Sequence, residues 1–311
     1  MYLKKPKFWD NKISILPYFL LPFTIFIIFA NFLRAQKKKI LPRKLKTICI
    51  GNIYVGGTGK TPTTIKLFKL IKKINNVATA KKHYLNQIDE EILLRKKTKL
   101  ITAENRLKIL YKAINKKVDV VIFDDGLQDG QIDYNLKIVC FNAINGVGNG
   151  FLIPAGPLRE NLENLKKYDA ALILCDNHSP KALKRLLIRY NSKLKIFTSN
   201  YEPTNLVDIN KNKKYFIFSG IGNPKSFEKI LKKNKLEIVD QVVFPDHYTY
   251  SDKDYTNIIN KAKNYNAKIL TTEKDYVKIP SRYKKNIKFL KLDLIIHNEK
   301  KFIKFIKLKI R

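Results

Sequence analysis

The sequence predicts an α/β fold with mostly parallel β-sheets, and three features of the chain support this prediction. Short apolar runs typical of buried strands alternate with longer amphipathic segments typical of helices. One apolar run, residues 46–52, passes directly into a glycine-rich loop and then into a helical pattern. A polar stretch, residues 200–214, separates two series of such elements. We therefore expect an N-terminal segment over 1–40, a first lobe over 41–205 and a second lobe over 206–311.

Apolar runs bounded by polar or turn-forming residues give the remaining strand predictions. They lie at 118–123, 137–141, 170–175, 195–198, 215–219, 268–271 and 287–290. A helix is predicted over 61–73, where Pro62 falls in the first turn and its missing N–H costs little. Ser251 and Asp254 have the spacing of a capping box, which predicts a helix that runs to about Tyr265.

The chain of 311 residues is strongly basic, with a formal net charge of +36, and its hydrophobic content of 45% excludes wholesale disorder. A basic surface attracts polyanions such as nucleic acids, anionic lipid headgroups or phosphorylated substrates. A compositional bias toward Lys, Ile and Asn would give the same excess, so charge alone does not choose a partner. Because the basic residues are spread along the chain without a nucleic-acid-binding motif, we expect no nucleic-acid partner.

The cysteines Cys49, Cys140 and Cys175 each lie in or at the end of an apolar run that we predict to be a strand. Their spacing fits neither a metal site nor a disulfide framework. We therefore expect the main body of the protein to reside in a reducing, cytosolic environment.

An uncharged apolar segment occupies residues 13–33, with lysines before it and basic residues after it. Its length is that of a minimal membrane span, roughly 20 residues. Pro17 and Pro22 should break or kink a helix in the first half of the segment. A buried core helix and a signal peptide are alternatives, although no small-residue cleavage site is evident. We favour membrane association, either spanning or interfacial, and within it an anchor at the cytoplasmic leaflet with the basic flanks on anionic headgroups.

The loop after the first predicted strand has the composition of a phosphate-binding loop. Its glycines would leave consecutive backbone N–H groups free to wrap a polyphosphate at a helix N-terminus. Lys60 would reach the β- and γ-phosphates and the Thr61 hydroxyl would bind Mg²⁺, although Tyr54 stands where the strict pattern has glycine. The predicted nucleotide-binding residues are Tyr54, Val55, Gly56, Gly57, Thr58, Gly59, Lys60 and Thr61.

Asp124 and Asp125 end the apolar run VVIFDD and would lie at the carboxyl edge of a parallel sheet. That is where an acidic residue completes the Mg²⁺ site of a P-loop protein. A strand that ends in Asp-Asp is otherwise often a simple turn, so this prediction depends on the preceding phosphate loop.

Other polar clusters are compatible with either a site or an ordinary surface. Asp89 opens a run of three acidic residues that could be a solvated helix start. His247 follows Asp246 in a loop just before a helix, and loops of this kind often carry site residues. The stretches 154–160 and 272–275 could each be a structural turn.

Taken together, five of these motifs resemble the tetraacyldisaccharide 4′-kinase family. They occur in the family's order and cover nearly the whole chain. The motifs are GNIYVGGTGKTP at 51–62, DDGLQ at 124–128, PAGPLRE at 154–160, FPDHY at 244–248 and TEKD at 272–275.

The resemblance implies an enzyme that uses ATP and Mg²⁺ to phosphorylate the 4′-hydroxyl of tetraacyldisaccharide 1-phosphate, a lipid-linked disaccharide precursor of lipid A. It also implies two α/β/α lobes, the first carrying the phosphate loop, and association with the bacterial inner membrane. We expect a monomer at the cytoplasmic face of that membrane. Asp89 would be the base, paired with His247, and Lys60 would act on the phosphates. The implied metal ligands are Thr61 and Asp125, with Asp124 and Glu160 as further candidates.

One region departs from the family's pattern. The usual S-R-G-Y-G element is replaced by AKKHY at 80–84, glycine is absent before Asp89, and Glu91 stands where proline usually follows. Reduced activity or altered substrate preference would be the consequence. Two other classes compete with the kinase: a P-loop ATPase that couples hydrolysis to movement, and a basic, non-catalytic membrane protein.

Overall fold

The computed structural model of the protein describes residues 5–11, 13–36, 39–42, 45–84, 87–176 and 178–310. The chain divides into two compact units, which are described separately. The larger unit takes in 5–84, 94–200 and 294–311, and the smaller unit takes in 201–293 together with the described part of 85–93. The division falls after Asn200, and 85–93 and 294–311 group against the order of the sequence. The predicted lobe bounds, with a change near residue 205, stay a prediction.

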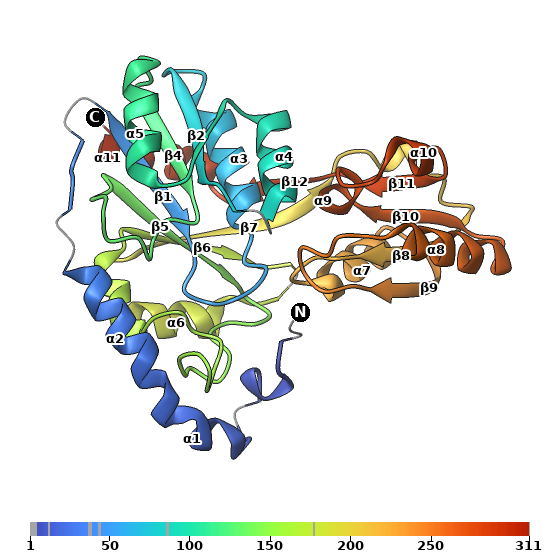
Figure 1. The fold of residues 1–311 in the computed structure, drawn as a ribbon, viewed down its shortest axis with the longest axis horizontal. Helices are drawn as coiled ribbons and strands as arrows, with labels where there is room; N and C mark the ends of the chain where they lie inside the picture. Colours follow the sequence, from blue (N-terminus) through green and yellow to red (C-terminus); the bar gives the residue numbers. More distant parts are fainter. Residues whose placement is uncertain are drawn as a thin grey trace. The chain divides into compact units, whose positions relative to one another are not determined.

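An eight-stranded sheet forms the larger unit (Figure 1). Its order is β12 (Leu292–Ile296), β7 (Lys195–Pro203), β6 (Ala170–Leu174), β5 (Leu136–Asn142), β1 (Lys46–Gly51), β4 (Val120–Asp124), β2 (Val77–Lys82) and β3 (Leu100–Ala103). Every neighbouring pair from β7 to β3 is parallel, which confirms the predicted architecture. β1 lies between β5 and β4, so the loop that follows β1 opens at the carboxyl edge beside the end of β4.

Helices pack on this sheet because the strands are apolar on both faces. They are α3 (Lys60–Ile71), α5 (Arg106–Asn115), α6 (Lys181–Tyr190) and α11 (Glu299–Ile310), with the 3₁₀ turn η4 (Leu162–Lys167). A further helix, α4 (Ile88–Lys97), begins in the smaller unit and ends in the larger one. One core cluster joins Val121 and Phe123 of β4 to Ile109 of α5. The three cysteines are buried and free.

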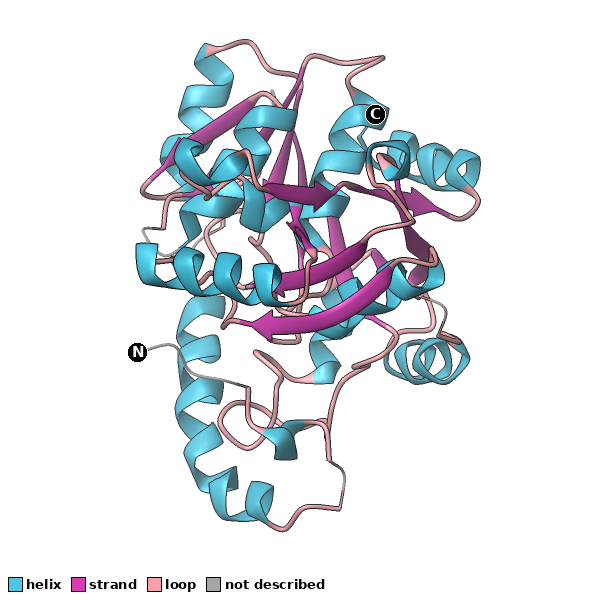
Figure 2. Ribbon diagram, turned by 90° about the vertical axis from the view of Figure 1, so that its right-hand side faces the viewer, coloured by secondary structure: helices cyan, strands magenta, loops and turns pink. Residues whose placement is uncertain are grey.

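The smaller unit contains a four-stranded parallel sheet, and Figure 2 shows its strands and helices by colour. Its order is β11 (Ile287–Leu290), β10 (Lys268–Thr272), β8 (Lys214–Ser219) and β9 (Glu237–Val243). Its helices are α7 (Pro224–Lys233), α8 (Asp252–Asn264), α9 (Glu273–Tyr276) and α10 (Ser281–Lys284), with the turn η5 (Leu206–Asp208). Successive residues of β8 enter two different hydrophobic core clusters. Tyr215 packs in the cluster that contains Phe227 of α7, and Phe216 packs in the cluster that contains Tyr255 of α8. The predicted capping box of Ser251 and Asp254 is present at the start of α8.

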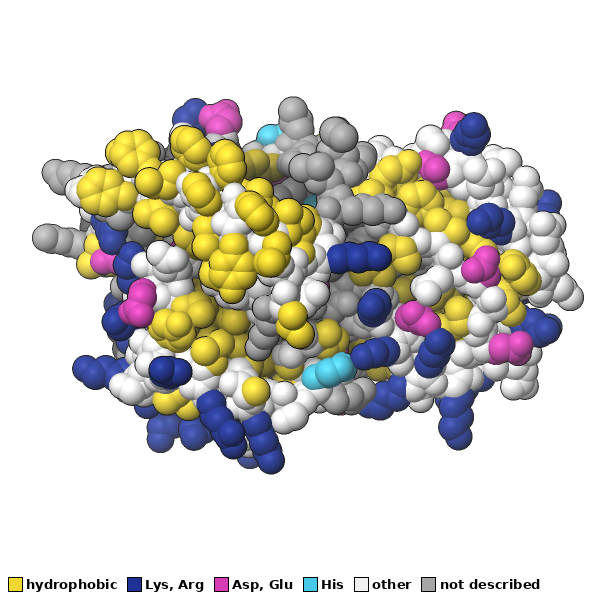
Figure 3. All heavy atoms as spheres, turned by 90° about the horizontal axis from the view of Figure 1, so that it is seen from below, with side chains coloured by type: hydrophobic (Ala, Val, Ile, Leu, Met, Phe, Trp, Pro, Cys, Tyr) yellow, Lys and Arg dark blue, Asp and Glu magenta, His cyan; other side chains and the backbone are white. Residues whose placement is uncertain are grey.

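The N-terminal apolar segment is helical and interrupted where Pro22 predicts a break. After the short turn η1 (Lys7–Trp9) come α1 (Leu16–Leu20), the 3₁₀ turn η2 (Leu21–Phe23) and α2 (Thr24–Ala35). By length and composition, 16–34 could cross a membrane, and only 11% of its most apolar window is buried, which argues against a core helix. Figure 3 shows its hydrophobic side chains gathered in a broad patch. The exposed members include Phe19, Phe23, Ile25, Phe26, Phe29 and Phe32.

Candidate active site

The loop between β1 and α3 has the backbone of an anion-binding site. Gly56 and Gly59 have φ of +126° and +83°, a left-handed region in which glycine avoids the steric cost of a side chain. Within the described residues, the amides of 56–59 donate to no backbone acceptor, and the buried Thr58 hydroxyl has no hydrogen-bond partner. The Val55 amide, by contrast, donates to the Pro157 carbonyl at 2.9 Å. The free amides therefore begin at Gly56, and with the α3 N-terminus they suit a phosphate group.

The Tyr54 side chain packs into the core of the larger unit and does not line the phosphate-binding loop. The ring is buried, and its hydroxyl donates to Asp10 at 3.0 Å while the Lys5 ammonium also reaches it. Burial, together with the charge of Asp10, raises the pKa of Tyr54, so the hydroxyl remains a donor. Because these contacts tie the loop to the N-terminal segment, a tyrosine is accommodated where the strict pattern has glycine.

Asp124 is the carboxylate that holds Thr61. Its Oδ2 accepts from the Thr61 hydroxyl at 3.0 Å, and its Oδ1 accepts from Thr64 one turn later at 3.2 Å. The Lys81 ammonium lies 3.4 Å from the same Oδ2. Asp124 therefore fixes the start of α3 at the end of β4. The resemblance implied that Thr61 shares Mg²⁺ with Asp125, and that role stays a prediction.

Asp125 faces the basic side chains of the site. The Lys60 ammonium lies 3.8 Å from Oδ2, and the Arg159 guanidinium donates to Oδ1 at 3.0 Å and to Oδ2 at 3.2 Å. Burial alone would raise the pKa of Asp125, but Lys60, Arg159 and Lys81 hold it below its usual value. Asp125 is consequently a carboxylate at neutral pH and keeps Lys60 beside the loop.

Glu160 is buried and extensively hydrogen-bonded. Its Oε1 accepts from Gln128 at 2.8 Å and from the Tyr168 hydroxyl, and its Oε2 accepts from Asn164 at 2.9 Å. A carboxylate oxygen has two lone pairs, so these bonds leave one on Oε2. Glu160 therefore braces the turn that carries Arg159, and its role as a metal ligand stays a prediction.

The smaller unit brings Asp89 and His247 together. Asp89 lies in the first turn of α4, and its oxygens are 2.9 and 3.1 Å from His247 Nδ1. His247 has a φ of +61°, and its amide donates to Asp246 Oδ1 at 3.1 Å, which holds the loop in this conformation. Burial would raise the pKa of Asp89, but the hydrogen bond from His247 and the charges of Lys274 and Lys278 hold it below its usual value. The pair is thus an ionised carboxylate with an imidazole on one side.

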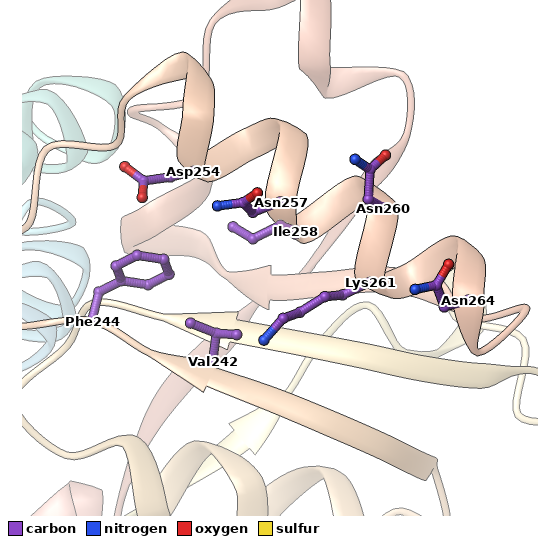
Figure 4. Close-up of a pocket in the computed structure, with 8 residues that line it drawn as sticks. All are labelled: Val242, Phe244, Asp254, Asn257, Ile258, Asn260, Lys261 and Asn264. Carbon is purple, nitrogen blue, oxygen red and sulfur yellow. The ribbon is translucent and has the colours of Figure 1, made fainter.

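The described structure has a hollow in each of its two units. A cleft of about 580 Å³ in the larger unit lies against Asp125 and is lined by the basic residues Arg34, Lys82, Arg106 and Arg159. A groove of about 420 Å³ in the smaller unit runs between α8 and the end of β9 (Figure 4). Its lining includes Val242, Phe244, Asn257 and Lys261 but none of the predicted site residues. The cleft beside Asp125 is therefore the hollow relevant to the site.

Sequence reasoning missed three charged side chains that contact the predicted residues. Lys81 pairs with Asp124 and Lys274 pairs with Asp89. The Arg159 side chain pairs with Asp125. The sequence could have indicated Lys81, because it directly follows the buried residues 77–80 of β2. A lysine in such a strand is buried only when it has a partner. Lys274 and Arg159 lay inside recognised motifs, but nothing local indicated which carboxylate each would meet.

The parallel sheet, the glycine loop at the start of α3 and the Asp124–Thr61 bond define a P-loop nucleotide-binding protein. The sequence model of the tetraacyldisaccharide-1-P 4′-kinase family matches residues 16–311. The chain belongs to this family, which confirms the resemblance seen in its motifs.

Two sequence relatives and one solved structure are similar to this chain over nearly its whole length. The tetraacyldisaccharide 4′-kinase of Pelagibacter ubique is 46% identical over 303 residues, which cover 96% of each chain. That of Rickettsia canadensis is 38% identical over 312 residues, covering 94% of this chain and 93% of the relative. The crystal structure of LpxK from Aquifex aeolicus in complex with ATP superposes with a TM-score of 0.73 at 25% identity, covering 96% of this chain and 100% of that one.

Proposed function

We propose that this chain transfers the γ-phosphoryl group of ATP to the 4′-hydroxyl of tetraacyldisaccharide 1-phosphate, a lipid A precursor. Family membership supports the reaction, and the ATP bound by the Aquifex relative supports the donor. The observation that carries the proposal is the arrangement of Lys60 and Thr61 against the two carboxylates that end β4. A glycine loop alone would indicate only that a phosphate binds.

The nucleotide phosphates would lie on the amides of 56–59. The left-handed glycines and the unpartnered Thr58 hydroxyl fit a ligand rich in acceptor oxygens. Lys60 would leave Asp125 for the β- and γ-phosphates, a short movement for a flexible side chain. Phosphoryl transfer asks the protein mainly for such positioning and charge neutralisation.

The residues around Thr61 also fit Mg²⁺. The Thr61 hydroxyl and the carboxylates of Asp124 and Asp125 are hard oxygen donors of the kind that Mg²⁺ prefers. Among the described residues no group of three or more His, Cys, Asp or Glu side chains could hold a metal ion, which suits an ion that takes its other ligands from water and phosphates. When bound, Mg²⁺ neutralises charge on the β- and γ-phosphates. Glu160 would brace the turn that carries Arg159, and the lone pair left on Oε2 keeps it a further candidate ligand.

Asp89 would accept the proton of the acceptor hydroxyl. As the hydroxyl oxygen bonds to the γ-phosphorus, the bond from that phosphorus to the β–γ bridging oxygen breaks, ADP leaves, and the proton passes to the Asp89 carboxylate. His247 would hold that carboxylate through Nδ1. General-base help of this kind is typically worth about 10²–10⁴ in rate.

The acceptor's chemistry agrees with two further features of the larger unit. The exposed apolar side chains of α1 and α2 suit the acyl region of a membrane, and Ile27 and Arg34 of α2 line the cleft beside Asp125. The guanidinium groups of Arg106 and Arg159 suit an anionic sugar phosphate. We infer a monomer held at the cytoplasmic face of the inner membrane, where ATP is available.

One assay tests the proposal against its rivals. The full-length protein is incubated with γ-labelled ATP, Mg²⁺ and a lipid A disaccharide precursor in detergent micelles, and the label is followed into the lipid phase. We expect labelled lipid with the wild-type protein and none with Lys60→Ala. ATP hydrolysis without labelled lipid would instead identify an ATPase, and absence of Mg·ATP binding would identify a non-catalytic protein.

A further inference from the structure

The TEKD segment carries a lysine that the reaction described so far does not use. Lys274 Nζ lies 3.5 Å from Asp89 Oδ2, 3.0 Å from Asp246 Oδ1 and 3.6 Å from Glu90 Oε1. The same ammonium is 3.4 Å from His247 Nε2. One cation thus touches both members of the Asp89–His247 pair and the two carboxylates beside them.

Lys274 is held in this place by the residue that follows it. Asp275 is fully buried, and its carboxylate accepts from the Gly220 amide at 3.0 Å, the Thr272 hydroxyl at 2.7 Å and the Tyr250 hydroxyl at 2.8 Å. Thr272 also caps α9 through the Asp275 amide. These bonds fix the single turn of α9, so Lys274 is presented to Asp89 by a rigid support.

Charge around Asp89 is unbalanced without Lys274. The ionisable groups that surround it are Glu90 on α4, Asp246 and His247 in the loop after β9, Tyr250 beyond that loop, and Lys274, Asp275 and Lys278 in and just after α9. Lys278 is committed chiefly to Asp275, at 3.1 Å, and reaches Asp89 only at 4.0 Å. Like charges this close favour protonation of one carboxylate, and a cation among them opposes it.

We propose that Lys274 is a positioning residue for phosphoryl transfer: it orients Asp89 and His247 and neutralises the carboxylates around them, so that Asp89 meets the acceptor hydroxyl in its ionised form. This inference rests on the proposed role of Asp89 as the base. The pKa of Asp89 agrees with this role, because burial raises it whereas His247 and Lys274 hold it below its usual value.

The test is the pH dependence of kcat and of kcat/KM for Lys274→Gln, with ATP saturating. Removing the ammonium should raise the pKa of Asp89, so the acidic limb of both profiles should move to higher pH by about one unit or more. Lys274→Arg should return the limb toward the wild-type position, and the KM for ATP should not change. Lys263→Gln, which removes an exposed lysine near the end of α8, is the matched control and should leave the profile unmoved.

A uniform loss of activity at every pH, with the limb unmoved, would mean that Lys274 only supports the fold and would overturn the inference. If Lys274→Gln does not fold, Asp246→Asn gives an independent reading, because it frees Lys274 for Asp89 and should move the limb to lower pH. An unmoved limb in Asp246→Asn counts against the inference. Wild-type turnover by Asp89→Asn would show instead that the proposed base is wrong.

Discussion

The Lys81 ammonium lies 3.4 Å from the Asp124 carboxylate, and the two side chains are 1% and 0% exposed. Lysine and aspartate are rarely buried to this degree unless they are paired. Asp124 also accepts from Thr61 and Thr64, so the pair ties the end of β2 to the end of β4 and to the first turn of α3. The AKKHY segment, a departure from the family's pattern, thus supplies a cation to the predicted magnesium site.

Lys81→Met should destabilise the protein strongly. Removing one partner of a buried pair leaves an uncompensated charge and costs about 3–5 kcal/mol. Urea unfolding measures the loss, and the double variant Lys81→Met with Asp124→Asn should recover much of it because no unpaired charge remains. Equal stability of wild type and Lys81→Met would show that the pair contributes nothing.

Lys60→Ala should abolish transfer without unfolding the protein. Lys60 is the only residue proposed to neutralise both the β- and γ-phosphates, and removing one such stabilising group typically costs about 10²–10³ in kcat. Lys66→Ala is a matched control, because Lys66 also lies on α3 but pairs with Glu299 at 2.6 Å. The measurement is labelled lipid formed per minute for both variants, and comparable losses would remove Lys60 from its proposed role.

The sequence identified those parts of the fold whose residues are buried on both sides. β1, β4, β5 and β6 are continuous apolar runs, and the fold places all four inside the large sheet. β2, β3, β9 and β12 were not predicted, and the last three are edge strands of their sheets. β2 is rich in Ala and Thr and ends in lysines, and β9 is an edge strand whose polar residues face solvent.

In the candidate site, too, the sequence predicted what depends on local patterns and not what depends on contacts made by the fold. The phosphate loop and the Asp-Asp strand end are local patterns, so sequence alone located them. The choice of Asp124 over Asp125 as the partner of Thr61 depends on side-chain directions that no spacing encodes. Asp89 and His247 are 158 residues apart, so only the resemblance, and not the pattern of residues, paired them before the fold did.

Asp124→Asn and Asp125→Asn should have different effects on the magnesium requirement. Asp124 bonds Thr61 directly, so its loss should raise the Mg²⁺ concentration for half-maximal activity about tenfold or more, in line with typical losses around metal sites. Asp125 faces Lys60 and Arg159, so its loss should change the KM for ATP more than the Mg²⁺ requirement. Magnesium titrations at saturating ATP measure the first effect. The reverse order of effects would assign the metal to Asp125.

Asp125 should also make stability sensitive to acid. Its pKa in the folded protein is held below the usual value, which is about 3.9 in unfolded chains. Its contribution is therefore complete above that value and is lost as pH falls through the folded pKa. The stability difference between wild type and Asp125→Asn should be large at pH 7 and shrink toward pH 2, as followed by urea unfolding. Asp252→Asn, at an exposed pair with Arg282, should show little difference at any pH. A difference for Asp125 that does not vary with pH would contradict this account.

The N-terminal helices should have two separable roles: their apolar face binds membranes, and α2 also contacts the turn that carries Arg159. Phe19, Phe26 and Phe29 are 71%, 69% and 60% exposed, and burying each phenylalanine in lipid is worth about 1.5–3 kcal/mol. Replacing all three by serine should weaken binding to anionic vesicles at least roughly a hundredfold, as measured by sedimentation. A loss of about 3 kcal/mol in binding free energy is enough for a hundredfold change, and the three phenylalanines together exceed it.

Asn31→Ala provides the matched control for this prediction. Asn31 donates from α2 to the Arg159 carbonyl at 2.9 Å, and Arg159 in turn holds Asp125. The variant keeps the exposed phenylalanines, so vesicle binding should be unchanged while transfer to the lipid acceptor falls. The triple serine variant should show the opposite pattern with an acceptor dispersed in detergent: weak vesicle binding and near wild-type turnover. Full sedimentation of the serine variant would show that the basic surface, and not this apolar face, holds the protein at the membrane.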